Sequence, residues 1–465
     1  MSRGRTDLAS GPVPLAPHMP RLALVAVAIS VVMMAVAWSV TSFHALPRLA
    51  PDSRSYLDWD VGRTPAYPLF LRVVPIGRVP AVQLLTLAAS AAWLAYAMRR
   101  VVRPHWCVLL QLSILGNPAL VSYAFTILPE ALFVAAGMAY CVLTLRFIDR
   151  PLSGTAMALG AVSMTIVLLK PSGYSFVAAL APVAWIARAR LRAIAMLVAP
   201  IVVLLSVAGT VNFVRSRVIG TQAFGGFSAL GYVGQLLDRS LDGDPLQARF
   251  VEIAAPVGRE LERIRGMDLY YFASGNAYHD VEAAQAIIAD ELRRQDPGAT
   301  PQQVFVRLNA IAWRWALTAI GEHPRGYLRQ VSASWYGLWL MPGLRNAADE
   351  PQFAEELRQL SAAAPRITRN AIVYRTVSPW VYWPVKITLG SGLVASIVGV
   401  FLALVRPVTL QPATLAATSV ALHANFLLVS GIQTGLPRYA LAMWPLTMVI
   451  LILTSALLVG RQSSV

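Results

Sequence analysis

The chain has 465 residues, of which 57% are hydrophobic and only 13% are charged, and its formal net charge is +16. Soluble proteins carry charged residues at about a quarter of their positions, so this composition excludes an ordinary soluble domain and indicates an integral membrane protein. The two cysteines, Cys107 and Cys141, both fall within apolar stretches, which excludes a disulfide framework and a zinc site built from cysteine pairs.

About ten apolar stretches approach the length that a helix needs to cross a bilayer, which is roughly 20 residues. In chain order they lie near residues 22–42, 81–98, 106–123, 129–147, 154–169, 172–187, 193–213, 387–405, 409–430 and 440–459. The first is long for the apolar core of a signal peptide, and the chain re-enters the membrane repeatedly, so we expect it to be an uncleaved anchor. These stretches predict an all-α polytopic membrane protein.

The basic residues indicate how the chain is oriented in the membrane. All but two of the 39 basic residues are arginine. With the N-terminus in the cytoplasm, the arginines expected on that side are Arg3, Arg5, Arg21, Arg99, Arg100, Arg103, Arg146, Arg150, Arg188, Arg190, Arg192, Arg406 and Arg461. Because short cytoplasmic loops favour Lys and Arg, much of the positive charge reports topology, and no nucleic-acid partner is predicted.

A polar loop at residues 43–80 follows the first span and carries three aspartates beside the membrane. An ionised carboxylate next to hydrocarbon is costly unless it pairs, binds a ligand or reacts. Asp52 is the strongest candidate for a general base, although the local sequence equally allows it to cap the short helix that follows. Asp58 and Asp60 could bind Mg²⁺ or Mn²⁺ together with Asp52, but pairing with Arg63 is the favoured interpretation.

Three further ionisable residues are expected on the same side of the membrane as Asp52. Glu130 follows Pro129 at the start of the fourth span, where a carboxylate also suits the helix dipole. Lys170 ends the fifth span and Arg438 precedes the last, and both suit a phosphate group at the membrane surface. The alternative for Lys170 is an ordinary lysine that extends to the interface.

The spans divide the chain into three parts. Residues 1–213 form an N-terminal membrane module that includes the 43–80 loop, residues 214–386 form an extracytoplasmic insert, and residues 387–465 return to the membrane. By alternation of the spans, the insert lies on the same side of the membrane as Asp52. A shared active site would require this arrangement.

The insert is predicted to be mainly helical. Thr300-Pro301-Gln302-Gln303 has the pattern of a capping box with proline in the first turn, and amphipathic helical runs start near Phe250 and Asp280. The segments 224–227 and 270–279 are rich in Gly and Tyr, and we interpret them as surface turns, with sugar-contacting loops as the alternative.

Several segments in order along the chain resemble the GT-C superfamily of integral-membrane glycosyltransferases. This superfamily uses polyprenyl-phosphate sugars and includes aminoarabinose, arabinofuranosyl and protein mannosyl transferases. The matching segments are Asp52-Ser53-x-x-Tyr56, Gly62-Arg63-Thr64-Pro65-x-Tyr67-Pro68, Pro129-Glu130-x-Leu132-Phe133, Lys170-Pro171, and Arg438-Tyr439 with Pro445. The insert departs from the family pattern, because it precedes the last three spans instead of following them. No zinc-protease, nucleophile-elbow or nucleotide-binding motif occurs in a convincing context.

The resemblance implies a GT-C-like helical bundle in the bacterial inner membrane, with an active site that faces the periplasm. It makes Asp52 the general base of an inverting sugar transfer, with Lys170 and Arg438 holding the lipid phosphate. The residues expected to bind substrate are Tyr56, Arg63, Tyr67, Glu130, Lys170, Arg438 and Tyr439.

The expected donor is a polyprenyl-phosphate-linked pentose, such as arabinose, or hexose. The acceptor is a protein such as a pilin, a glycan or a lipid. No metal or other cofactor is predicted, although the acids of the first loop could suit a divalent cation.

Two other functions stay open at the level of the sequence. An O-antigen polymerase or ligase would use diphosphate-linked donors, and it also combines many spans with a large periplasmic loop. A lipid or sugar transporter ranks third, because transporters place ionisable residues near the membrane midplane, whereas here they gather at one edge.

Overall fold

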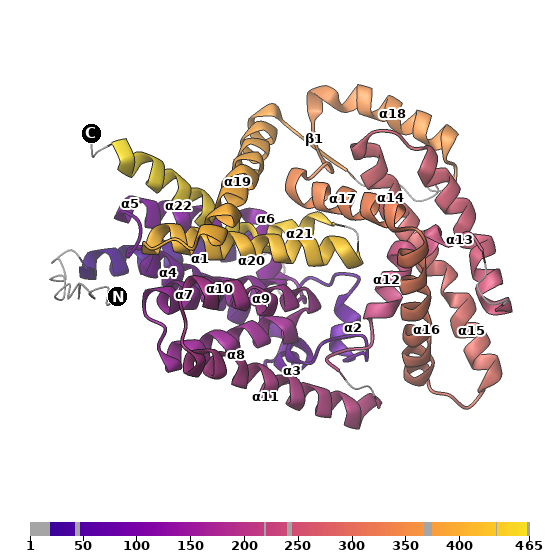
Figure 1. The fold of residues 1–465 in the computed structure, drawn as a ribbon. Coiled ribbons are helices and arrows are strands. Elements are labelled where there is room, and N and C mark those ends of the chain that lie inside the picture. The colour runs from indigo at the N-terminus through magenta and orange to yellow at the C-terminus, as the bar shows by residue number, and fades with distance from the viewer. Residues whose placement is uncertain are drawn as a thin grey trace, which may run out of the picture.

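The computed structural model describes residues 19–41, 47–217, 220–239, 244–366, 374–433 and 435–462. Arg3, Arg5 and the first residues of the predicted 43–80 loop lie outside these ranges. Within them the protein is almost entirely helical, which confirms the predicted fold class (Figure 1). The strands in the described residues are β1 (Leu344–Asn346) and β2 (Arg375–Val377), which pair in parallel with Leu344 opposite Arg375.

The membrane part consists of helices that run roughly alongside one another (Figure 1). Before the insert these are α1 (Met19–Thr41), α4 (Val79–Met98), α5 (Pro104–Leu115), α6 (Pro118–Ser122), η2 (Tyr123–Phe125), α7 (Glu130–Asp149), α8 (Ser153–Leu169), η3 (Pro171–Gly173), α9 (Tyr174–Ala178), α10 (Leu180–Ile186) and α11 (Leu191–Ser216). After the insert they are α19 (Pro379–Val405), α20 (Leu410–Ile432), α21 (Pro437–Ala442) and α22 (Trp444–Gln462). The first loop contributes α2 (Ser53–Leu57), α3 (Ala66–Val73) and η1 (Ile76–Arg78).

Each of the ten predicted spans coincides with an apolar helix or with a bent helix pair. Five of these helices, α4 together with η1, α7, α11, α19 and α20, are long and apolar enough to cross a membrane within the described residues. The pair Pro104–Leu115 and Pro118–Phe125, bent by 52°, makes a sixth if it is counted as one span. The other four, Leu24–Ser39, Ser153–Leu169, Pro171–Ile186 and Trp444–Val459, are apolar helices of 10–17 residues.

Burial separates the central helix of the bundle from one at its surface. The most apolar window of α7 is 72% buried inside the protein, whereas that of α11 is only 11% buried. An apolar helix left uncovered by protein needs hydrocarbon around it, so α11 faces lipid and α7 forms the centre of the bundle.

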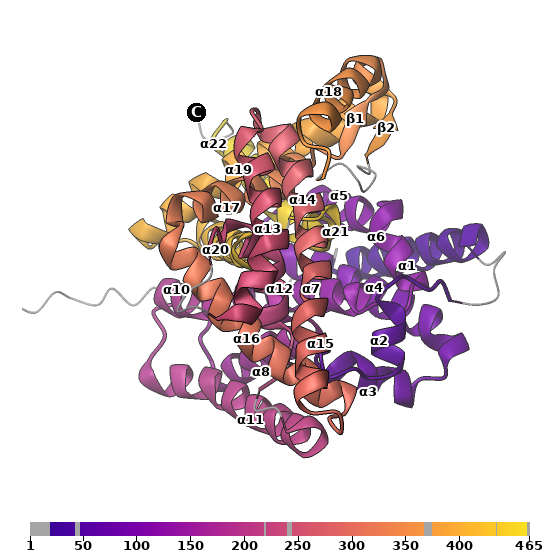
Figure 2. The same ribbon diagram turned by 90° about the vertical axis from the view of Figure 1, so that its right-hand side faces the viewer.

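The insert forms a helical layer beside one end of the bundle (Figures 1 and 2). Its elements are α12 (Gly225–Val233), η4 (Gly234–Leu236), α13 (Pro245–Arg263), α14 (Met267–Ala284), α15 (Ala286–Gln295), α16 (Pro301–Glu322), α17 (Pro324–Leu340), η5 (Ala347–Asp349) and α18 (Glu350–Ala363). Figure 2 shows α18 and the two short strands together at one end of this layer.

The predicted capping box is present at the start of α16. The Thr300 hydroxyl accepts a hydrogen bond from the Gln303 backbone N–H at 3.3 Å, and Gln303 Oε1 accepts one from the Thr300 N–H at 2.8 Å. The amphipathic run after Phe250 lies on α13, and its Phe250, Ala254 and Leu261 are buried as expected.

The two segments interpreted as turns are helical, so that prediction was wrong. Gly225 begins α12, and residues 270–279 lie in the middle of α14. Tyr270, Ala273 and Ala277 of α14 pack into one hydrophobic cluster of the insert. The free energy gained by burying these side chains outweighs the weak helix preference of glycine and tyrosine.

Four hydroxyl groups of the insert join it to the end of α20 and the chain that follows, and the longest of these bonds runs from Ser228 to the carbonyl of Ile432 at 3.4 Å. Tyr327 donates to the carbonyl of Gly431 at 3.0 Å, and Tyr271 donates to that of Gly435 at 3.0 Å. Ser334 donates to the carbonyl of Gln433, also at 3.0 Å. These bonds set the position of the segment that leads into α21.

The start of α12 lies in close contact with α16, another helix of the insert. A Cβ atom on Gly226 would lie 2.1 Å from the backbone oxygen of Asn309 in α16, whereas one on Gly225 would meet nothing within 4 Å. The side chain of Asn309 also accepts the backbone N–H of Gly226 at 2.8 Å.

We therefore expect Gly226→Ala to push α12 away from α16 and to lower the free energy of unfolding by about 1–3 kcal/mol. Thermal unfolding of the purified protein in detergent measures this. Gly225→Ala is the matched control and should leave the melting temperature almost unchanged. Equal melting temperatures for the two variants would contradict the close helix contact.

Candidate active site

Five ionisable side chains from separate parts of the chain line one cavity where the bundle meets the insert. They are Asp52 and Arg63 from the first loop, Glu130 at the start of α7, Lys170 at the end of α8, and Arg438 in α21. The cavity has a volume of about 80 Å³, which is smaller than a typical pocket for a complete organic ligand, about 300–1,000 Å³. As it stands, the cavity has room for one small polar group.

Asp52 is held between two arginines. Its Oδ1 accepts from Arg63 Nη2 at 2.8 Å, and its Oδ2 accepts from Arg438 Nη1 at 2.9 Å. Burial by itself raises the pKa of Asp52, but the two guanidinium groups outweigh it and hold the pKa below the usual 3.8. The carboxyl group is therefore ionised at neutral pH.

Asp52 does not cap the helix that it precedes. It occupies the N-cap position of α2, but its side chain makes no hydrogen bond to the backbone of that helix. The alternative based on local sequence is therefore excluded, because the carboxylate turns toward the cavity.

The rest of the first loop orients Arg63. Its Nε donates to the Ser55 hydroxyl at 2.8 Å and its Nη1 donates to the Tyr56 hydroxyl at 3.4 Å. The guanidinium lies 4.6 Å from the centre of the Tyr56 ring and 5.8 Å from that of Phe224, a residue of the insert. Arg63 thus has a fixed position between the loop and the insert.

Lys170 forms a buried ion pair with Glu130. The distance from Nζ to Oε1 is 3.0 Å, and the two side chains are 10% and 3% exposed. Nζ also lies 4.2 Å from the centre of the Tyr439 ring. Lys170 does not extend to an interface, since it is enclosed in the cavity wall.

Several polar atoms in the cavity wall have no hydrogen-bond partner among the described residues. Arg438 Nε and Glu130 Oε2 are both buried and unpaired. An ammonium group has three donors, and among the described residues Lys170 Nζ uses one of them in a hydrogen bond to Glu130. The wall can therefore donate hydrogen bonds to a further anionic or polar group.

The remaining predicted residues lie at different depths. Tyr439 lines the cavity, and its hydroxyl donates to Gln433 Oε1 at 3.0 Å. Tyr67 does not line it: its side chain is fully buried behind Tyr56, with the two rings edge to face at 5.3 Å. Its hydroxyl contacts Gln83 Oε1 at 3.4 Å, so Tyr67 supports Tyr56 from behind.

The other two aspartates of the loop lie outside the cavity wall. Asp58 pairs with Arg54 at 3.4 Å on the surface, and Asp60 accepts the Gly62 backbone N–H at 3.2 Å. The favoured pairing of Asp58 or Asp60 with Arg63 was wrong, because Asp52 takes that place. In the described part of the chain, no group of three His, Cys, Asp or Glu residues is arranged to hold a metal ion.

The insert contributes residues to the cavity that were not predicted from the sequence. Gln222, Phe224 and Ser228 line it from the start of α12 and the chain before it. The Phe224 ring is 3.2 Å from the place where a Gly62 Cβ would lie. The Phe-Gly-Gly-Phe pattern was the available signal, since it allows close approach of two backbones, but it was interpreted as a turn.

The charges of the cavity favour an anion. Arg63, Lys170 and Arg438 carry three positive charges, and Asp52 and Glu130 carry two negative ones, which leaves one positive charge unmatched. Burial alone would lower the pKa of Arg438, but the neighbouring Tyr439, Glu130 and Asp52 together raise it by more than burial lowers it. The net pKa is above the usual value, so the guanidinium stays charged. A group of opposite charge, such as a phosphate, would complete the balance.

Comparison with known proteins gives one similarity, to a solved structure. No protein-family model and no curated protein sequence matches the chain. The chain is similar to the crystal structure of ArnT from Cupriavidus metallidurans bound to undecaprenyl phosphate, with 13% identity and a TM-score of 0.32, over 95% of this chain and 78% of that one. At this TM-score the likeness carries no further argument.

The buried pair of Lys170 and Glu130 predicts an asymmetric effect on stability. Lys170→Met leaves an uncompensated carboxylate in the protein and should lower the free energy of unfolding by about 3–5 kcal/mol, whereas adding Glu130→Gln should recover part of that loss. Thermal unfolding in detergent at pH 7 compares the two variants. If the double variant unfolded at a lower temperature than Lys170→Met alone, the unpaired charge of Glu130 would not be the cause of the loss, and the interpretation of the two residues as a buried ion pair would be contradicted.

Proposed function

We propose that the protein is an inverting glycosyltransferase that moves a sugar from a polyprenyl-phosphate donor to a periplasmic acceptor. The acceptor is a protein, a glycan or a lipid. The observation that carries the proposal is the convergence of Asp52, Arg63, Glu130, Lys170 and Arg438 in one cavity at the edge of the helical bundle. Three cations and two carboxylates in that place suit a reaction between a phosphate leaving group and a hydroxyl nucleophile.

The donor phosphate would bind to Lys170 and Arg438. Lys170 has spare N–H donors, and Arg438 has a buried Nε without a partner among the described residues. A phosphate on these groups would satisfy the donors and neutralise the unmatched charge. It would also compete with Asp52 for Arg438, so donor binding would loosen one of the two ion pairs that hold the carboxylate.

Asp52 would act as the general base. In the reaction the acceptor oxygen forms a bond to the anomeric carbon, the bond from that carbon to the phosphate oxygen breaks, and the phosphate leaves with the electron pair. The hydroxyl proton passes to Asp52. The acceptor oxygen becomes strongly acidic as its new bond forms, so a carboxylate with a lowered pKa is still basic enough to accept this proton.

The phosphate leaves as a stable anion and needs no acid catalyst. Cations near its oxygens stabilise the charge that develops there, which is the larger part of catalysis in such a site. Because attack comes from the face opposite the leaving phosphate, the anomeric configuration inverts.

The distribution of charge supports a periplasmic site. The arginines of the loops after α4 and α10, such as Arg99, Arg103 and Arg190, lie at the opposite ends of the helices from Asp52. If those loops are cytoplasmic, as the bias of short loops favours, the cavity and the insert face the periplasm of a bacterial inner membrane.

Replacement of Asp52 tests the role of the base. Asp52→Asn keeps the shape of the side chain but removes the proton acceptor, so transfer should fall by about 10²–10⁴-fold. Asp58→Asn is the matched control, since Asp58 lies on the same loop but pairs only with surface Arg54. Purified proteins are assayed with a polyprenyl-monophosphate sugar and, in parallel, with a diphosphate-linked donor.

Two results would overturn the proposal. Unchanged transfer by Asp52→Asn would remove Asp52 from the role of base. Transfer only from the diphosphate-linked donor would favour a polymerase or ligase, and accumulation of substrate in proteoliposomes without a covalent product would favour a transporter.

The low pKa of Asp52 predicts a flat acid side in the pH profile. The group is ionised above its lowered pKa, and its ion pairs with Arg63 and Arg438 are lost only as the pH falls through that value, below 3.8. We therefore expect kcat/KM of the transfer to stay constant between about pH 8 and about pH 5 as far as this carboxylate is concerned. The expectation would be contradicted if the wild type lost activity with a midpoint near pH 6 and the residual activity of Asp52→Asn did not show this loss.

A further inference from the structure

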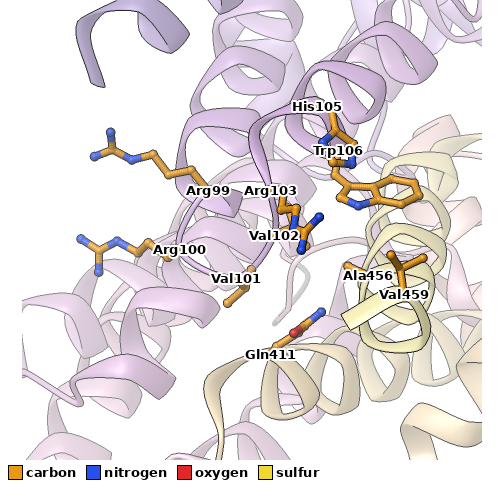
Figure 3. A pocket seen from close by; sticks show the side chains of 10 residues that line it. All are labelled: Arg99, Arg100, Val101, Val102, Arg103, His105, Trp106, Gln411, Ala456 and Val459. Carbon is orange, nitrogen blue, oxygen red and sulfur yellow. The ribbon is translucent and has the colours of Figure 1, made fainter. Parts of the chain in front are cut away.

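A second cavity lies at the opposite end of the bundle from the candidate active site. It has a volume of about 370 Å³ and is lined by the turn between α4 and α5, the first turn of α20 and the last turns of α22 (Figure 3). Helix α7 runs from Glu130 of the active site to Asp149, which pairs with Arg100 of the second cavity at 2.7 Å. Its 20 residues correspond to about 30 Å, so the two cavities are separated by the thickness of a membrane core.

The polar wall of this cavity is strongly basic. Arg99, Arg100 and Arg103 all line it, and none of its ten described lining residues is acidic. Only Arg100 has an ion-pair partner in the described residues, Asp149. The guanidinium of Arg99 lies 3.6 Å from the centre of the Tyr96 ring, and its buried Nη1 has no hydrogen-bond partner. About two positive charges therefore stay uncompensated.

The arginines are arranged around an opening that also has an apolar side. In Figure 3 the side chains of Arg99 and Arg100 both extend to one side, away from Trp106 and Gln411, whereas the guanidinium of Arg103 lies between these two residues. Ala456 and Val459 of α22 lie beside Trp106. A ligand would thus meet cations on one side and hydrocarbon on the other.

An exposed apolar stripe leads from the cavity along α5. His105 lines the cavity, and Leu109 and Leu112 follow at helical spacing with 50% and 41% of their surface exposed. Leu458 and Val459 of the neighbouring α22 are 64% and 47% exposed. In a chain that spans a membrane, this surface faces lipid and can accommodate acyl chains.

We propose that this cavity binds the phosphate headgroup of an anionic membrane lipid in the leaflet opposite the active site. The phosphate would contact Arg103, with Arg99 and Arg100 adding positive charge at the edge of the cavity, and the acyl chains would follow the stripe of Leu109 and Leu112. Basic pockets between membrane helices on the cytoplasmic side bind anionic headgroups for the same physical reason. The site is separate from the sugar-transfer chemistry, and the proposal does not depend on it.

The experiment measures lipid binding by the full-length chain in neutral detergent. Short-chain phosphatidylglycerol and phosphatidylcholine are titrated separately, with native mass spectrometry as the readout. Wild type should prefer phosphatidylglycerol. Each arginine near a charged headgroup contributes about fivefold in affinity, so Arg99→Gln with Arg103→Gln should weaken phosphatidylglycerol binding by about tenfold or more and leave phosphatidylcholine unchanged.

Matched variants separate this site from general charge. Arg190→Gln with Arg192→Gln removes the same charge from another loop on the same side and should keep the preference. If the first double variant does not fold, Arg103→Glu replaces it, because Arg103 is exposed and its side chain has no ion-pair partner among the described residues.

Three outcomes would overturn the proposal. One is equal affinity of wild type for both lipids, and another is an equal loss in the control double variant. The third is binding of inorganic phosphate as tight as that of phosphatidylglycerol, which would show a site for a free anion.

Discussion

The ion pairs of Asp52 with Arg63 and Arg438 are the interaction on which the rest of the site depends. A carboxylate at a membrane edge is stable only when opposite charges surround it, and here the two cations come from positions 11 and 386 residues further along the chain. The first loop and the last helices must therefore come together before Asp52 can be buried. The closed cavity thus depends on contacts between the first loop and the last helices.

The second ion pair, between Lys170 and Glu130, likewise joins two elements, since Lys170 ends α8 and Glu130 begins α7. Each carboxylate in the cavity is matched by a cation from another element, so the cavity can exclude water without leaving a bare negative charge. The one positive charge left over is what distinguishes this cavity from a purely structural network. It gives the cavity a preference for an anion.

The membrane helices and the ionisable site residues could be predicted from the sequence, because apolar length and isolated charges are local signals. The position of Tyr67 could not, since nothing local distinguishes a tyrosine that lines a cavity from one that packs behind it. The same holds for α14, where the burial of Tyr270 and Ala277 decides the conformation. The part played by Phe224 depends on its approach to Gly62, a contact between distant segments.

The four hydroxyl groups that hold the segment before α21 all bind backbone carbonyls, those of Gly431, Ile432, Gln433 and Gly435. A carbonyl is present whatever the side chain, but Gly435 itself is restricted, because a Cβ there would lie 2.1 Å from the backbone oxygen of Ser334. An insert transplanted from another protein would have to reproduce these four hydroxyls to keep Arg438 aligned with Asp52. Exchange of the outer layer is thus limited by these donors as well as by packing, since the Trp339 ring of α17 lies 4.9 Å from the Phe426 ring of α20 in the core of the bundle.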